Sequence, residues 1–176
     1  MSRLRRPFLS DRYIFVTVCL LKTRWALFDP DFERLANALA RMRRKHGLLL
    51  TAWVFLPDPS ADGHAIIYPP HPLTVSRVFQ AVKVSSTTAI NVRRGERGEL
   101  WQGRFFDRAL RTVREYNEKV EYIHLNPVRR GLVERAEQWR WSSVHEYAGV
   151  SGEEQERRCG LRIDRVRLPA DENTPI

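Results

Sequence analysis

The strongest constraint on the fold is a set of short apolar runs rich in β-branched and aromatic residues. The runs are YIFVTVCLL at 13–21, LLLTAWVFL at 48–56 and HAIIYP at 64–69. Each has the length and composition of a strand buried in a sheet. The second run is typical of a central strand, and the third is expected to pair with it as an antiparallel hairpin. The chain must therefore bury these runs in a sheet.

Segments with helical periodicity separate the strands. Asp29 can cap a helix with Pro30 at its first position, and apolar residues then recur at helical spacing until Gly47. The same spacing predicts a second helix over about 74–91. A further strand and its approach are expected in LWQGRFFDRALR at 100–111, where aromatic and basic residues alternate irregularly.

A third helix is expected directly after this strand. TVRE at 112–115 is a capping box, in which Thr112 and Glu115 satisfy each other's free amide groups. The helix should end at about Asn126, because Pro127 follows. The order strand, helix, strand, strand, helix, strand, helix predicts an α+β fold in which helices cover a central antiparallel sheet.

The length of the chain fits one domain. Of the 176 residues, we expect 1–150 to form that domain and 151–176 to be a charged, mobile tail. Only two cysteines occur, which supports neither a disulfide framework nor a cysteine-based zinc site. The chain has no signal peptide and no apolar run long enough for a membrane span, so we expect a cytoplasmic protein, either a monomer or a homodimer.

The charge balance favours a polyanionic partner. Lys and Arg number 30 against 21 Asp and Glu, a formal net charge of +9. Nucleic acid is the commonest polyanion in a cell, and neutralising its phosphates releases condensed counterions. The alternative is a basic protein whose charges are simply scattered over its surface.

One tyrosine lies off the apolar stripe of the third predicted helix. The stripe consists of Val113, Tyr116, Val120 and Ile123. Tyr122 projects roughly 140° from it, and Asn126 shares its side of the helix one turn later. Such a tyrosine can be an ordinary surface residue, or a nucleophile that forms a covalent ester with a phosphate.

Four motifs, in this order and spacing, resemble the REP-associated tyrosine transposases. They are WVFLPD at 53–58, WQGRFFDRALR at 101–111, YIHLNPVRRGLV at 122–133 and WRWSS at 139–143. These enzymes are single-strand transposases that pair an HUH motif, two histidines around a bulky residue, with one catalytic tyrosine. The resemblance covers about residues 10–148. It implies a ferredoxin-like HUH fold and an endonuclease that cleaves hairpins of repetitive extragenic palindromes.

The resemblance also implies a set of site residues. Tyr122 would attack the DNA and form a 5′-phosphotyrosine link during DNA transposition and recombination. Asn126 and His64 would bind a divalent metal, Mg²⁺ or Mn²⁺. The first histidine of the motif is missing, so the HUH motif is degenerate. Asp62 lies two residues before His64, a spacing that points side chains the same way on a strand, and its carboxylate is a suitable replacement ligand.

Two main functions remain open. The first is an enzyme that binds single-stranded or hairpin DNA and performs metal-dependent cleavage and strand transfer, with activity reduced by the lost ligand. The second is a catalytically inactive, transposase-derived DNA-binding protein. A basic RNA-binding domain is a third, but no RNP-like or GXXG motif supports it. Both main functions would use the same DNA-binding residues, which are Lys83, Arg104, Arg108, Arg111, Arg129 and Arg130. Solvated surface and local ion pairing are the alternative roles of these basic residues.

Overall fold

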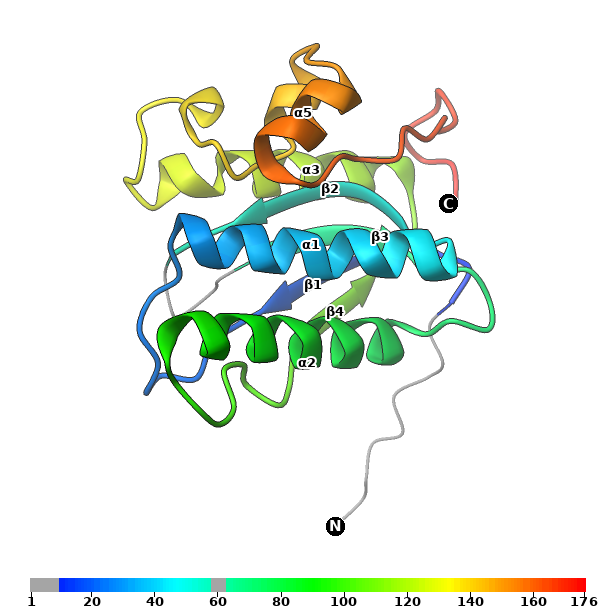
Figure 1. Ribbon diagram of the computed structural model, residues 1–176. Coiled ribbons are helices and arrows are strands. Elements are labelled where there is room, and N and C mark those ends of the chain that lie inside the picture. The colour runs from blue at the N-terminus through cyan, green and yellow to red at the C-terminus, as the bar shows by residue number, and fades with distance from the viewer. Residues whose placement is uncertain (1–9, 58–62) are drawn as a thin grey trace.

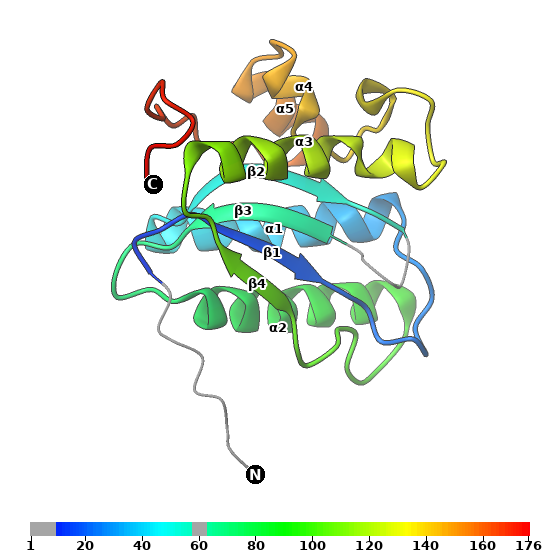
Figure 2. The same ribbon diagram turned by 180° about the vertical axis from the view of Figure 1, so that it is seen from behind.

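The computed structural model describes residues 10–57 and 63–176, and it has the predicted α+β architecture. Its main elements, in chain order, are β1 (Ile14–Val18), α1 (Asp29–His46), β2 (Leu49–Phe55), β3 (Gly63–Tyr68), α2 (Val75–Arg94), β4 (Phe106–Ala109) and α3 (Val113–Arg129). The strands form one antiparallel sheet in the order β2-β3-β1-β4. Helices α1 and α2 cover one face, and α3 lies on the other (Figures 1 and 2).

The hairpin of β2 and β3 is confirmed, but β2 is an edge strand and not a central one. Its outer edge is paired with the segment that follows α3. Phe55 N donates to the Trp141 carbonyl and Ser143 N to the Trp53 carbonyl, each over 2.9 Å. Because this segment supplies partners for the edge, β2 can be as apolar as a strand in the middle of a sheet.

The first two helices differ from prediction only at their ends. Phe28, and not Asp29, is the N-cap of α1, and its amide donates to the Asp31 carboxylate over 3.3 Å. The Asp29 carboxylate instead accepts a hydrogen bond from the Trp141 indole over 2.8 Å. Gly47 ends α1 as predicted, with φ of 66°. Helix α2 continues to Arg94, beyond the expected end near residue 91.

The prediction that α3 ends before Pro127 is wrong, since the helix continues to Arg129. A proline inside a helix removes one backbone hydrogen bond and crowds the preceding turn. Here the helix ends two residues later, so little of it depends on the lost bond. The backbone carbonyls of Asn126 and Pro127 still accept from the amides of Arg130 and Leu132 over 3.1 and 2.9 Å. The added residues bring Arg129 over the Tyr122 ring, and the C-cap Arg130 donates to the Asn126 side chain.

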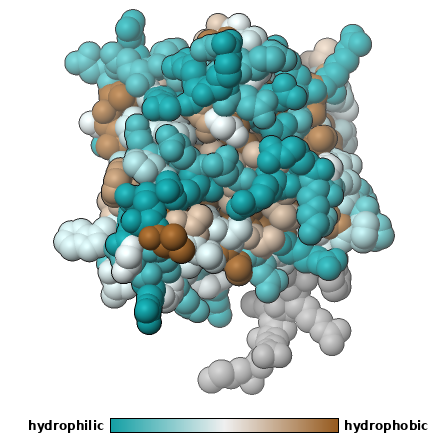
Figure 3. Space-filling model, in the orientation of Figure 1, coloured by the Kyte–Doolittle hydropathy of each residue, from teal (hydrophilic) through white to brown (hydrophobic). Residues whose placement is uncertain are grey.

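The sheet separates two apolar layers. The layer under α1 and α2 contains Val16, Trp53, Phe55 and Ile67, all nearly inaccessible to solvent. The layer under α3 is smaller and contains Phe15, Val54, Ile66 and Ile123. The outer surface over α1 and α2 is mostly hydrophilic (Figure 3). Within residues 10–57 and 63–176, the helices lack the combination of length and apolar character that membrane crossing requires.

The chain after α3 packs back onto the domain. A 3₁₀ turn (Ala136–Gln138), α4 (Val144–Tyr147) and α5 (Gly152–Cys159) follow one another there. Beyond α5, the Asp164 carboxylate accepts hydrogen bonds from Arg43 and from the Leu50 amide, each over 2.9 Å. Segment 151–176 thus has a helix and defined contacts, and the mobility expected of it stays a prediction.

Candidate active site

Pairing across the four strands aligns one row of residues on the α3 face. His64 in β3 lies opposite Val54 in β2 and opposite Thr17 in β1, and Thr17 lies opposite Phe106 in β4. Residues directly opposite each other in a sheet share a face. The row therefore places His64 in the interior of the sheet and Phe106 at its open edge, with Thr17 between them.

His64 is buried and hydrogen-bonded at both ring nitrogens. Its Nδ1 lies 2.8 Å from Thr17 Oγ1 and its Nε2 lies 3.2 Å from Asn126 Nδ2. Because an amide nitrogen only donates, Nε2 accepts, and Nδ1 carries the proton and donates to Thr17. Burial and, to a smaller extent, the charges of Arg130 and Lys119 together lower the pKa of His64 to about 4. The ring is therefore neutral near pH 7.

Tyr122 lies beside this histidine on the surface of α3. Its ring contacts the ring of His64 edge-on, with 5.3 Å between the centroids, and the ring of Phe15 at 5.8 Å. Two cations lie over the tyrosine ring, Lys119 Nζ at 5.2 Å and the Arg129 guanidinium at 5.5 Å from its centroid. Tyr122 and Asn126, expected on one side of the helix, thus meet at His64.

The Asn126 amide connects the histidine to a third cation. Its Oδ1 accepts a hydrogen bond from Arg130 Nε over 2.7 Å, while its nitrogen faces His64. Asn126 is only 3% exposed. Arg130 lies four residues after Asn126, the spacing at which side chains on a helix meet. The arginine thereby fixes the amide with its oxygen turned away from the histidine.

The described residues do not by themselves fit a divalent metal. Between 10–57 and 63–176 there is no group of three or more His, Cys, Asp or Glu side chains that could hold one. His64 offers Nε2, but the Asn126 oxygen is bound to Arg130. Lys119 adds a further positive charge nearby. The predicted ligand Asp62 lies outside the residues that the structure describes.

The predicted DNA-binding arginines lie at different places in the fold. Arg129 lies over the Tyr122 ring, and Arg130 donates to Asn126. Arg104 is exposed two residues before β4. Arg111 is exposed before the start of α3, roughly 16 Å from Tyr122 along the helix axis at 1.5 Å per residue.

Arg108 combines exposure with an ion pair. Its guanidinium donates to the Glu115 carboxylate over 2.8 Å, and its side chain is 54% exposed. It lies opposite Phe15 in the sheet, so it projects on the α3 face. Both alternatives raised for this arginine, surface exposure and local pairing, therefore apply.

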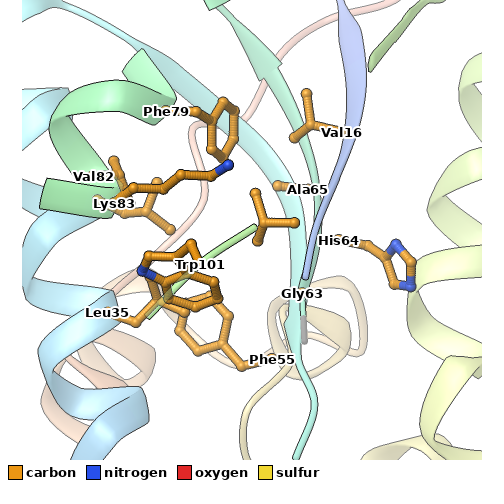
Figure 4. A pocket seen from close by; sticks show the side chains of 12 residues that line it. Val16, Leu35, Phe55, Gly63, His64, Ala65, Phe79, Val82, Lys83 and Trp101 are labelled. Atoms are coloured by element: carbon orange, nitrogen blue, oxygen red, sulfur yellow. The ribbon is translucent and has the colours of Figure 1, made fainter. Parts of the chain in front are cut away.

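Lys83 is separated from this group by the sheet. It projects from α2 into the apolar layer with Phe79, Val82 and Trp101, whereas His64 points toward α3 (Figure 4). Its ammonium donates to the Gln102 carbonyl over 2.6 Å. The structure therefore brings Tyr122, His64, Asn126, Arg129 and Arg130 together, and it places Lys83 on the other face.

Sequence reasoning missed the contribution of β1. Phe15 contacts both Tyr122 and His64, and Thr17 sets the proton position on His64. Alternation along a strand places Phe15 and Thr17 on one face. The polar Thr17 inside an apolar run was a usable signal. Its partner could be identified only from the strand register.

A helix that carries a tyrosine over an antiparallel sheet with a buried histidine is the arrangement that the resemblance to single-strand transposases predicts. No family model matches the chain. A REP-associated tyrosine transposase of Escherichia coli K12 is 30% identical over 146 residues, which are 82% of this chain and 84% of the relative. A Haemophilus influenzae protein described under the same family name is 33% identical over 153 residues, with 82% and 86% covered.

A solved structure agrees with these relatives. The REP-associated tyrosine transposase bound to a REP hairpin superposes with a TM-score of 0.71 at 29% identity, covering 83% of this chain and 84% of that one. The chain therefore belongs to the REP-associated tyrosine transposase family.

Proposed function

We propose that this protein binds hairpin DNA with single-stranded flanks on its α3 face and cleaves the strand through Tyr122. The observation that carries the proposal is the convergence of Tyr122 with two cations over its ring and with the buried pair of His64 and Asn126. The similar solved transposase is bound to a REP hairpin, which supports the same class of DNA for this chain. Action on DNA also favours the cytoplasm.

The cations beside the tyrosine suit a scissile phosphate. Lys119, Arg129 and Arg130 lie around Tyr122 and Asn126, and Arg and Lys are the side chains that bind phosphate best. A phosphate bound there would place its phosphorus within reach of the phenol oxygen. Tyr122 is partly exposed on α3, so a ligand can reach it from solvent.

The chemical step exchanges one phosphate ester for another. The phenol of Tyr122 loses its proton to solvent, and its oxygen bonds to phosphorus. The bond between phosphorus and the 3′ oxygen breaks, and that oxygen leaves as a hydroxyl after taking a proton from solvent. The result is a 5′-phosphotyrosine link, which conserves the ester for later strand transfer.

One observation favours the second function, DNA binding without cleavage. The polar groups at the centre of the site satisfy each other, since Asn126 donates to His64 and accepts from Arg130. The described residues supply no third metal ligand. A relative that had lost its metal would keep the basic surface and therefore the DNA, because the arginines do not depend on the metal.

The experiment is an assay for the covalent adduct. Purified protein and Tyr122→Phe are incubated with end-labelled hairpin DNA carrying single-stranded flanks, in Mn²⁺, in Mg²⁺ and in EDTA. A denaturing gel detects the adduct, and a native gel detects binding. We expect an adduct with the wild type and none with Tyr122→Phe, while both bind the hairpin.

The outcomes separate the two functions. Binding without an adduct in any metal would overturn cleavage and leave a DNA-binding protein. An adduct that persists in Tyr122→Phe would show that another residue is the nucleophile. An adduct in EDTA would show that the cations of the site suffice without a metal. Absence of binding to every hairpin would overturn the proposal as a whole.

A further inference from the structure

One exposed aromatic side chain continues the row that contains His64. Phe106, in β4, is 58% exposed, although it lies on the same face of the sheet as the buried His64 and the half-buried Thr17. Two strand spacings separate it from His64, about 10 Å. The sheet thus presents a large apolar ring to solvent on the face over which α3 carries the tyrosine.

Part of the sheet next to this ring has no helix over it. Helix α3 packs on β2 and β3, and in Figure 2 no helix lies over β1 and β4 on this face. In the described part of the chain β4 pairs with β1 alone, so its other side is a sheet edge. A strand of another molecule can therefore lie along the α3 face beside β4 without displacing any helix.

Phe106 belongs to a connected set of rings that ends at the tyrosine. Its centroid lies 6.3 Å from that of Phe15, and Phe15 lies 5.8 Å from Tyr122. Phe106 and Phe15 meet edge to face, at 66° between the planes. Because Phe106 and Phe15 meet edge to face and are not stacked, a face of the Phe106 ring remains on which a planar group can stack.

Two basic side chains lie on the same face of the sheet as this ring, one of them, Arg108, in an ion pair with Glu115. Arg108 follows Phe106 by two residues and projects on the same face with its side chain 54% exposed. Lys119 Nζ lies 4.9 Å from the centroid of Phe15. An exposed aromatic ring between basic side chains is the arrangement with which proteins hold single-stranded nucleic acid, the ring stacking on a base and the cations binding phosphates.

We infer that Phe106 is a base-stacking residue, which holds an unpaired nucleotide next to the phosphate that Tyr122 attacks. This rests on the proposed function. Every base has a π-face, so the contact selects for an unpaired nucleotide and not for a sequence. Phe106 would thereby discriminate hairpins with single-stranded flanks from fully paired DNA. It is a positioning residue, because it fixes where the strand crosses the phenol.

The test compares two DNA probes and two kinds of variant. The probes are one labelled DNA hairpin with an oligothymidine extension and the same stem without it. The variants are Phe106→Ala and Phe106→Trp, which keeps a ring. The control is Trp25→Ala, since Trp25 is 79% exposed and lies by the end of α2, where its carbonyl accepts from Arg94. Binding is measured by fluorescence anisotropy.

We expect Phe106→Ala to weaken binding of the extended hairpin by about tenfold or more, since stacking on one base is worth that much. The blunt hairpin should bind equally well to wild type and variant. Phe106→Trp should retain the affinity, and Trp25→Ala should match the wild type on both probes. A fluorescent purine analogue in the extension should be quenched by the wild type and not by Phe106→Ala.

Each other result counts against the inference. Equal weakening of both probes would show a general effect on folding or charge, and no weakening of either would show that the ring carries no base. In both cases the blunt hairpin still reports on DNA binding, so the proposed function survives. Absence of binding of both probes to the wild type would overturn the proposed function and the inference with it.

Discussion

The two faces of the sheet differ in the side chains that they carry. Under α1 and α2 the layer is apolar, and the lysine that enters it, Lys83, donates to a backbone carbonyl at its edge. Under α3 the apolar layer is smaller, and a neutral histidine, an amide and a tyrosine lie at its end among cations. Stability is thus concentrated on one face, and ligand chemistry is available on the other.

This comparison shows where a small domain can place polar chemistry. A buried polar group costs free energy unless it is hydrogen-bonded, and this cost offsets the stability that the packing around it provides. Here the histidine is held from two sides, by Thr17 and Asn126, at the border between covered and open sheet. The opposite face is covered by α1 and α2 and holds the larger apolar layer.

The largest expected effect lies on the packed face. Phe32 in α1 is 1% exposed and packs against Phe55 and Trp141, with ring centroids 6.0 and 5.4 Å away. Phe32→Ala should reduce the free energy of unfolding by about 3–5 kcal/mol, because it opens a cavity in the core. Tyr122→Phe on the other face should cost less than about 0.5 kcal/mol. Urea unfolding at pH 7.5 measures both, and similar losses would contradict the division between the faces.

A smaller effect should appear when the pH falls. The pKa of His64 is lowered to about 4 by burial, so the unfolded chain takes up a proton below its ordinary value of 6.5 while the folded chain does not. The unfolded state then binds more protons, and stability is lost as the pH drops from 6.5 toward 4. Between pH 7.5 and 5 this amounts to about 1–2 kcal/mol.

The variant His64→Gln isolates the contribution of His64 to the pH dependence of the free energy of unfolding. Glutamine does not titrate in this range, so relative to the wild type the variant should gain about 1–2 kcal/mol when unfolding is measured at pH 5 in place of pH 7.5. Burial also raises the pKa of Glu146 to about 7, which acts in the opposite direction, with stability lost as the pH rises through 7. That contribution is common to both proteins and cancels in the comparison. A pH-independent difference would show that His64 titrates normally in the folded state.

The sequence predicted the fold better than the contacts of the site. Period-two and helical patterns located the strands and helices, because burial imposes these patterns directly. Pattern alone could not show that β2 is an edge strand, since the residues that cover it, Trp141 and Ser143, come from a distant segment. The prediction that α3 ends before Pro127 was wrong because a proline near the C-terminus of a helix costs only one hydrogen bond.

Within the site, the positions of residues on one helix could be predicted from their spacing in the sequence. The register between strands could not be predicted in this way. Tyr122 and Asn126 were placed on one side of α3 by helical geometry, and both lie at His64. Thr17 and Phe106 join them only through the register of β1 with its two neighbours. Register depends on which faces are buried, and no local pattern reports that. The roles of the site residues, including Asp62, stay predictions.

The smallest expected effect compares one cation from each face, through the salt dependence of DNA binding. Arg129 lies beside Tyr122, whereas Lys83 lies across the sheet with its ammonium on the Gln102 carbonyl. Each phosphate contact adds about one released counterion, so Arg129→Met should lower the slope of log affinity against log salt by about 1. Lys83→Met should leave that slope unchanged, although it loses the bond to residue 102. Titrations of labelled hairpin at several salt concentrations give both slopes. A reduced slope for Lys83→Met would mean that DNA reaches the α2 side of the sheet, and the assignment of ligand chemistry to the α3 face alone would then be wrong.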